Sequence, residues 1–283
     1  TMNNCTLADY ILVRTLSSYE IALPKRFRDA IHRLDQVLAS VKEAAPRWKD
    51  CMNAVRLSMQ NAASSLYARK YFDQETRKTA EEMIEGIRSA FLEMLDEADW
   101  MDKVTKATAR EKAVAMLGLI GHEPWELDDK ELTERYKELN VTPATSPFAD
   151  TNSRVILWHL HESQRQLLKP VNRSTMVLSS FDIGAVYSAT SNSIQVPAAI
   201  LQPPFFHATF PAGLNFGAMG VVLGHELTHG FDDQGSQFDG KGNLRQWWHN
   251  ETKKEFVSRA NCVIDQYDAI KVPEAVVNGT VLN

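Results

Sequence analysis

Three features that would settle the class of this protein are missing from its sequence. No run of 18 or more apolar residues occurs, so no segment of the chain is expected to cross a membrane. Basic residues are not in excess, because the sequence has 31 Lys and Arg and 36 Asp and Glu. The resulting net charge of −5 does not indicate a surface that binds nucleic acid. Residues 1–20 also lack the basic start and the cleavage site of a signal peptide.

Cysteine is scarce as well. The three residues, Cys5, Cys51 and Cys262, have spacings that fit neither a zinc motif nor a redox motif. Because the count is odd, at least one of them has no partner within this chain.

The character of the sequence changes near residue 174, and we predict two parts, 1–173 and 174–283. Apolar periodicity in the first part predicts a series of helices, with Pro46 and Asp73 as starting signals. The predicted helices cover residues 7–20, 25–43, 46–66, 73–95, 105–119, 127–140 and 151–168. The second part has β-rich runs at 176–178, 183–187 and 193–196 and a helix at about 251–267. Pro197 ends the last run, which suits an edge strand.

Two of the predicted helices carry apolar stripes with helical spacing, which predict faces that pack into a core. Stripe residues in the first are Trp48, Cys51, Met52, Val55, Met59, Ala62, Ala63 and Leu66. In the second they are Met83, Ile84, Ile87, Phe91, Met94 and Leu95.

The candidate catalytic residues lie in the pentapeptide HELTH, residues 225–229. His225 and His229 are four residues apart, so a helix places both imidazoles on one face as candidate zinc ligands. Glu226 between them could act as general base on a metal-bound water. The apolar, glycine-rich run 216–224 predicts a buried helix before the motif, with Asn215 as a candidate N-cap. The alternative is a polar helix face with two surface histidines.

A second set of metal-type side chains, His159, His161 and Glu162, lies in a predicted helix. Residues two apart on a helix point to different faces, so ordinary surface or core histidines are the better interpretation.

Asn-x-Ser/Thr sequons, the acceptor pattern for N-glycosylation, are more frequent than chance predicts. They lie at Asn4, Asn140, Asn172, Asn250 and Asn278. The excess favours a secreted or cell-surface glycoprotein.

Several motifs together resemble the neprilysin and endothelin-converting-enzyme family of zinc metallopeptidases. The matching stretches are AAILQPPFF (198–206), LNFG (214–217), VLGHELTHGFDDQG (222–235) and GNLRQWW (242–248). Weaker matches are Arg47-Trp48 with Cys51, residues 61–67 and residues 99–102. The residues that follow the histidines look nearer to endothelin-converting enzymes than to neprilysin.

The resemblance implies an α+β, mainly helical fold with a thermolysin-like zinc peptidase core and a small sheet with an exposed edge strand, incomplete at both ends. It implies one zinc per chain in the full protein, bound by His225, His229 and a downstream Glu beyond Asn283, with Glu226 as general base. The implied activity is cleavage of bioactive peptides on the amino side of hydrophobic residues. By the same resemblance, Cys51 and Cys262 have partners outside this stretch and do not pair with each other.

For the substrate, the resemblance implies that peptide lies along an edge strand near Ala185. An apolar pocket would be lined by Ile200, Phe205, Val221 and Val222, for which plain core packing is the alternative. Asp232 could orient a metal ligand, or it could shape the turn at the end of the helix. The family has an Asn-Ala pair where this sequence has Gly184-Ala185, so a side-chain amide contact is missing.

The expected partners are therefore peptide substrates, with no nucleic acid, and a membrane only through an upstream anchor absent from this chain. The expected location is the cell surface, as a type II membrane ectodomain, or the secreted fraction. Two alternatives stay open: a non-catalytic ectodomain that binds a peptide or a partner, and an inactive fragment without a third zinc ligand.

Overall fold

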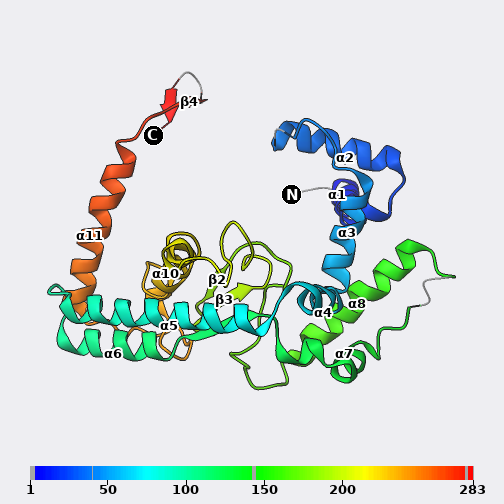
Figure 1. Cartoon of the computed structure of the whole chain (residues 1–283). Helices are drawn as coiled ribbons and strands as arrows, with labels where there is room; N and C mark the ends of the chain where they lie inside the picture. The colour runs from blue at the N-terminus through cyan, green and yellow to red at the C-terminus, as the bar shows by residue number, and fades with distance from the viewer. Residues whose placement is uncertain (1–3, 40, 142–144, 278–279, 283) are drawn as a thin grey trace. The chain divides into compact units, whose positions relative to one another are not determined.

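The computed structural model of the chain describes residues 4–39, 41–141, 145–277 and 280–282. It is mainly helical with a small three-stranded sheet, which confirms the expected α+β class (Figure 1). The chain forms two compact units: unit 1 holds residues 1–70, 122–171 and 179–181, and unit 2 holds 71–121, 172–178 and 182–283. The predicted division of the chain into 1–173 and 174–283 stays a prediction. In the structure, residues 71–121 belong to unit 2, which also contains the histidine motif.

Unit 1 consists of helices. Its elements are α1 (Asn4–Ser18), η1 (Glu20–Ala22), α2 (Lys25–Leu38), α3 (Arg47–Ser58), α4 (Gln60–Tyr71), η2 (Pro124–Leu127), α7 (Asp129–Tyr136) and α8 (Phe148–Gln166). The helix predicted over 46–66 is interrupted at Met59, where the backbone leaves the helical region (φ −127°, ψ 43°). The stripe predicted to face a core is largely solvent-exposed, with Trp48 at 63% and Leu66 at 74%. That prediction was wrong because periodicity reveals an apolar face and does not reveal what covers it.

Unit 2 contains both sheets and the histidine motif. Its helices are α5 (Gln74–Glu97), α6 (Lys103–Val114), α9 (Ala212–Asn215), η3 (Phe216–Gly220), α10 (Val221–His229), η4 (Gly235–Gln237) and α11 (Asn250–Asp268). Its strands are β1 (Leu117–Gly121), β2 (Val186–Ser188), β3 (Ser193–Pro197), β4 (Val272–Val277) and β5 (Thr280–Leu282). The Asp73 side chain accepts a hydrogen bond from the amide of Thr76 and so caps α5, as predicted. None of the described helices is both long and apolar enough to cross a bilayer.

The three-stranded sheet has the order β1–β3–β2, parallel between β1 and β3 and antiparallel between β2 and β3. The predicted edge strand, β3, is therefore central and fully buried. Pro197 is tolerated because it is the last residue of β3, and the next amide, of Ala198, bonds to the carbonyl of Gly121. β2 begins only at Val186, and the run 176–178 is not a strand in the described structure.

Strand β1 was not predicted, because the run 105–119 looked like one helix. The helix ends at Val114, and Leu117–Gly121 then pairs with β3. Gly121 ends the strand with φ +81°, and a Cβ there would lie 2.2 Å from the Phe72 ring. A glycine is therefore required at this tight turn and close approach.

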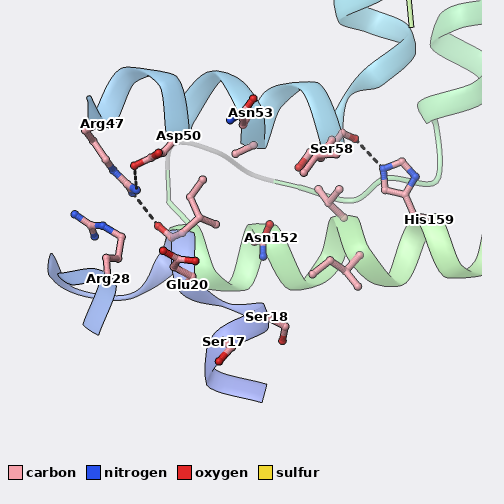
Figure 2. A pocket seen from close by; sticks show the side chains of 15 residues that line it. Ser17, Ser18, Glu20, Arg28, Arg47, Asp50, Asn53, Ser58, Asn152 and His159 are labelled. Atoms are coloured by element: carbon pink, nitrogen blue, oxygen red, sulfur yellow. Dashed lines mark hydrogen bonds and ion pairs between the residues drawn. The ribbon is translucent and has the colours of Figure 1, made fainter. Parts of the chain in front are cut away.

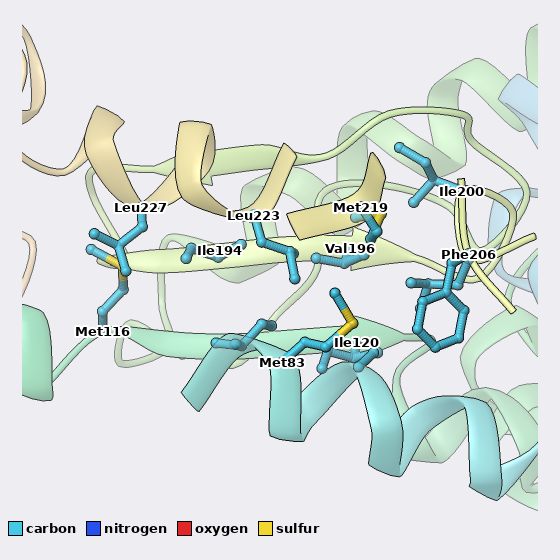
Figure 3. Packing of buried hydrophobic residues seen from close by; sticks show 13 residues of the cluster. Met83, Met116, Ile120, Ile194, Val196, Ile200, Phe206, Met219, Leu223 and Leu227 are labelled. Carbon is cyan, nitrogen blue, oxygen red and sulfur yellow. The ribbon is translucent and has the colours of Figure 1, made fainter. Parts of the chain in front are cut away.

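In the core of unit 2, side chains of α5, α10 and the three-stranded sheet pack against one another, and the two helices also contact each other (Figure 3). Met83 of α5, Ile194 and Val196 of β3 and Leu223 of α10 meet there, each at most 4% exposed. Burying side chains of this kind contributes about 1.5–3 kcal/mol each. The core thus fixes α10, which carries the histidines, against the sheet.

Candidate active site

The helix that carries the motif is continuous with a π-helical turn. Residues 212–229 run through α9, η3 and α10 without leaving helical dihedral angles, and Pro211 precedes the first turn. The predicted N-cap, Asn215, was wrong: it lies inside this helix, and its buried amide side chain bonds instead to the backbone N–H and C=O of His207. Isolated π-turns are frequent at functional sites.

His225 and His229 project from the same side of α10, as their spacing predicts. Their Nε2 atoms are 2.9 Å apart, and the rings are nearly perpendicular with centroids 4.4 Å apart. Both side chains are accessible to solvent, so this pair is open to a ligand.

Asp232 contacts both His229 and the turn after the helix, the two places on which the sequence-based alternatives depend. One carboxylate oxygen, Oδ2, lies 2.7 Å from Nδ1 of His229. The other, Oδ1, accepts hydrogen bonds from the amides of Gln234 and Gly235 at 2.9 and 2.7 Å. Burial alone would raise the pKa of Asp232, but the bonds from His229 and the two amides outweigh it and lower that pKa. The carboxylate therefore stays ionised and can accept from Nδ1–H of the imidazole.

Glu226, next to His225 on α10, is buried, whereas the two histidines are accessible to solvent. Its side chain is only 6% exposed, and its carboxylate makes no hydrogen bond or ion pair within the described ranges. A buried carboxylate without fixed partners is free to accept a proton from a bound molecule, which is a requirement for a general base.

The pair of histidines fits a zinc ion in chemistry and spacing. Neutral imidazole is a preferred zinc ligand, and zinc–nitrogen bonds of about 2.0–2.1 Å in a tetrahedral site hold two nitrogens about 3.3 Å apart. The observed 2.9 Å differs from this by a few tenths of an ångström, which small rotations of the rings can supply. Among the described residues no group of three His, Cys, Asp or Glu side chains is placed to hold a metal. His225 and His229 are thus a two-ligand set in this part of the chain.

Beside α10 runs the exposed edge of the sheet. A Cβ on Gly230, just after the helix, would lie 3.5 Å from the Tyr187 ring of β2, so strand and helix end are in close contact. Ala185 immediately precedes β2, where the resemblance places the substrate strand. Gly184 has φ +145°, a conformation that side-chain-bearing residues rarely adopt.

The four predicted pocket residues have different environments. Ile200 is buried in the core with Val196 and Phe206 (Figure 3), which favours packing as its role. Val222 is partly buried against the same core, whereas Phe205 and Val221 are exposed. Their assignment to one pocket stays a prediction.

The other predicted features are distributed over the surface. His159 bonds through Nε2 to the carbonyl of Ser58, and Glu162 pairs with Arg165, so these residues have structural partners. All three cysteines are free and exposed. The sequon residues Asn140, Asn172 and Asn250 are exposed, while Asn278 and the side chain of Asn4 lie outside the described residues.

Unit 1 contains a cavity of 420 Å³ between η1, α3 and α8 that the sequence did not suggest (Figure 2). Arg47 ion-pairs with Asp50 at 3.6 Å and donates to the carbonyl of Ile21 at 2.8 Å. Burial, together with the carboxylates of Asp35 and Asp50, raises the pKa of Glu20. These contacts hold η1 against α3. They give the charged side chains of the cavity structural partners, so no catalytic role is needed to explain them.

Sequence reasoning missed Lys112 of α6, whose side chain is 1% exposed and lies next to the turn that carries Asp232. A signal was present. The buried residues of α6 are Thr105, Ala109, Lys112 and Ala113, so a lysine occupies the apolar stripe at helical spacing.

Curated proteins of known name are similar to this chain over most of its length. The chain is 42% identical over 266 residues to neprilysin-1 of Caenorhabditis elegans, which covers 94% of the chain and 35% of that protein. It is 36% identical over 283 residues to human endothelin-converting enzyme 1, covering 99% of the chain and 36% of that enzyme. The chain therefore spans about a third of the length of these curated relatives.

Solved structures show the same similarity. Zinc metalloprotease ZMP1 of Mycobacterium tuberculosis, in complex with an inhibitor, matches 90% of the chain with 37% of its own, at a TM-score of 0.77 and 26% identity. A Haemonchus galactose-containing glycoprotein complex matches 98% of the chain with 42% of its own, at a TM-score of 0.82 and 25% identity. Two family models, both described as "Peptidase family M13", match residues 2–123 and 184–283, which together make up more than half of the sequence. The chain belongs to peptidase family M13.

Proposed function

We propose that this chain carries the metal-binding and general-base part of a zinc endopeptidase that cleaves bioactive peptides on the amino side of hydrophobic residues. The observation that carries the proposal is the convergence of the Nε2 atoms of His225 and His229 at 2.9 Å, with Asp232 on Nδ1 of His229. His225, His229 and a downstream Glu, expected from the resemblance, would hold one zinc per chain.

Zinc bound there would supply Lewis acidity for the scissile carbonyl and for a water molecule. Glu226 would accept the proton of that water and deliver it to the leaving amine. Asp232 would keep the Nδ1–H tautomer of His229 and leave the Nε2 lone pair for the metal.

The peptide would add to the outer edge of β2, with the backbone of Ala185 as a further anchor. Close contact between β2 and the end of α10 supports this placement, because a peptide on that edge passes beside the histidines. Phe205, Val221 and Val222 would contact the hydrophobic residue after the cut, with Ile200 behind them.

The test is Glu226→Gln in the protein made from its complete gene. The amide keeps the shape of the side chain and cannot accept a proton. We expect full zinc content and a fall in hydrolysis of a peptide with Phe or Leu after the cut by at least about 10²–10⁴-fold, or about 3–5 kcal/mol of barrier. A Glu226→Gln enzyme with the wild-type rate would refute the assigned base.

A second candidate is a binding protein, or a polypeptide inactive by itself. The two-ligand set favours it, since no third metal-type side chain joins His225 and His229 within the described ranges. A zinc-loaded wild type that cleaves no member of a broad peptide library would establish this alternative.

We further propose a cell-surface or secreted location, with N-glycans on the five sequons. The exposed Asn140, Asn172 and Asn250 support this, as does the likeness to a complex named as a glycoprotein. Treating the natural protein with a glycosidase that releases N-glycans, followed by peptide mass spectrometry, tests each site. The same digest tests whether Cys51 and Cys262 avoid pairing with each other.

A further inference from the structure

The most unusual buried group outside the histidine motif is the ammonium of Lys112. Lysine is rarely buried completely unless a partner compensates for the lost water. Here Nζ donates hydrogen bonds to the carbonyls of Gly235 and Phe238, both at 2.7 Å. No carboxylate of the described residues lies within ion-pair distance of it. The carbonyls of one turn are therefore its principal partners.

Three aromatic rings complete the surroundings of this ammonium. Nζ lies 5.9 Å from the ring centroid of Tyr187, 5.5 Å from that of Phe231 and 5.7 Å from that of Trp247. Distances below about 6 Å permit attraction between a cation and a ring face. The rings come from β2, from the residue after Gly230 and from the segment before α11, so Lys112 lies where three segments of unit 2 meet.

The turn that Lys112 holds is the one that positions Asp232. The amide of Gly235 donates a hydrogen bond to Oδ1 of Asp232, and the carbonyl of Gly235 accepts one from Nζ of Lys112. Gly235 therefore links the two side chains directly. A Cβ on Gly235 would lie 1.8 Å from the carbonyl oxygen of His229. The turn is thus packed directly on the end of α10, and a shift at Gly235 would move the carboxylate on His229.

Backbone contacts of the same lysine reach the edge strand. The Asn192 side chain donates to the carbonyl of Lys112 at 3.1 Å and to that of Gly240 at 3.0 Å, and it accepts from the Tyr187 hydroxyl at 3.0 Å. Lys112 therefore connects the turn after the histidines to the β2–β3 turn.

We infer that Lys112 is a positioning residue, which fixes the turn 232–238 so that the Asp232 carboxylate stays on Nδ1 of His229 and the Nε2 lone pair remains directed at a metal. The inference rests on the proposed zinc site. Lys112 lies more than a hundred residues before the motif and does not touch His229, yet it would help to orient that metal ligand. Residues that orient metal ligands typically change metal affinity 10–100-fold when they are replaced.

The test uses Lys112→Met in the protein made from its complete gene, because methionine is similar in length and donates no hydrogen bond. We expect the zinc dissociation constant, measured by competition with a chelator, to rise at least tenfold. A second readout needs no metal: in the metal-free protein, ¹⁵N–¹H correlation of the histidine rings should show the Nδ1–H form of His229 in the wild type and a mixture of tautomers in Lys112→Met.

Controls separate positioning from simple stabilisation. Ile120→Ala removes buried core volume from β1, away from the turn, and should lower thermal stability while zinc affinity stays within twofold. In an Asp232→Asn background, Lys112→Met should change zinc affinity by less than twofold, because the pathway through Asp232 is already lost. Lys112→Gln, whose shorter, uncharged side chain retains an NH₂ donor group, should be intermediate, and it replaces the methionine variant if that one does not fold.

A wild-type tautomer and zinc affinity within twofold in Lys112→Met would overturn the inference, as would equal losses in the presence and absence of Asp232. A wild type that binds no zinc would count against the proposed function instead, and the tautomer of metal-free His229 would still decide the role of Lys112.

Discussion

The two units of this chain use apolar residues in opposite ways. Unit 2 buries its apolar residues between α5, the sheet and α10 (Figure 3), and the histidine motif lies on that framework. In unit 1 the apolar faces of α2 and α3 stay exposed, with Val37 at 80% and Trp48 at 63%. Both regions have the same helical periodicity in the sequence. The difference teaches that periodicity predicts a helix and its apolar side, while the sheet and its register decide which side becomes a core.

The largest effect is expected from Gly235→Ala, which disrupts the packing beside the candidate active site in unit 2. A methyl group there would lie 1.8 Å from the carbonyl oxygen of His229, so the turn must move. We expect a loss of more than about 4 kcal/mol in the free energy of unfolding, a size reserved for severe local conflict. Chemical denaturation measures it. Gly213→Ala, where the methyl meets nothing within 4 Å, is the matched control and should stay within about 1 kcal/mol of wild type.

A direct comparison of the two units uses the same substitution in each. Leu201→Ala in unit 2, at 2% exposure, should cost about 2–5 kcal/mol because it leaves a cavity. Leu66→Ala in unit 1, at 74% exposure, should cost less than about 0.5 kcal/mol. If Leu66→Ala proves as costly as Leu201→Ala, the face of α4 is covered in solution and the contrast between the units fails.

The pH dependence of stability offers a further comparison of the two units, through one lysine in each. Burial lowers the pKa of Lys112 to about 8, against the opposing pull of the Asp239 and Asp232 carboxylates. Between pH 8 and 10.5 the unfolded chain then binds a proton that the folded protein has lost, so the free energy of unfolding rises with pH. Relative to Lys112→Met, the wild type should gain up to about 3 kcal/mol over this range.

The control for that titration is Lys137 of unit 1, which is exposed. Its hydrogen bond and charge pairing with Glu134 raise its pKa, so its contribution to stability is present at pH 8 and is lost as the pH rises above its ordinary value. Relative to Lys137→Met, the wild-type free energy should fall at high pH. Equal slopes for the two lysines would contradict the assigned burial of Lys112.

The smallest effect is expected at Gly184, just before strand β2, along which the substrate peptide is proposed to lie. Gly184→Asn would introduce the amide that the family resemblance implies, but φ is +145° and an L-residue is strained there. We expect a loss of about 1–3 kcal/mol in stability and no gain in affinity for peptide. Tighter peptide binding with unchanged stability would show that the backbone relaxes and that only the missing amide limits substrate contact.

Much of the site could be predicted from the sequence, because its parts are local. A spacing of four residues places His225 and His229 together on any helix, and the Asp232 contact spans only three residues. The Asp73 cap was predictable for the same reason. What failed depends on distant partners: β1 forms because β3 accepts it, and Lys112 is buried because a turn more than a hundred residues later supplies its carbonyls.

Calorimetric titration with zinc, on the protein made from its complete gene, tests the central claim that His225 and His229 are metal ligands. The wild type should bind one zinc per chain, and His225→Ala and His229→Ala should each abolish that binding, while circular dichroism confirms that the helices remain. Stoichiometric zinc in the double variant His225→Ala/His229→Ala would contradict the account.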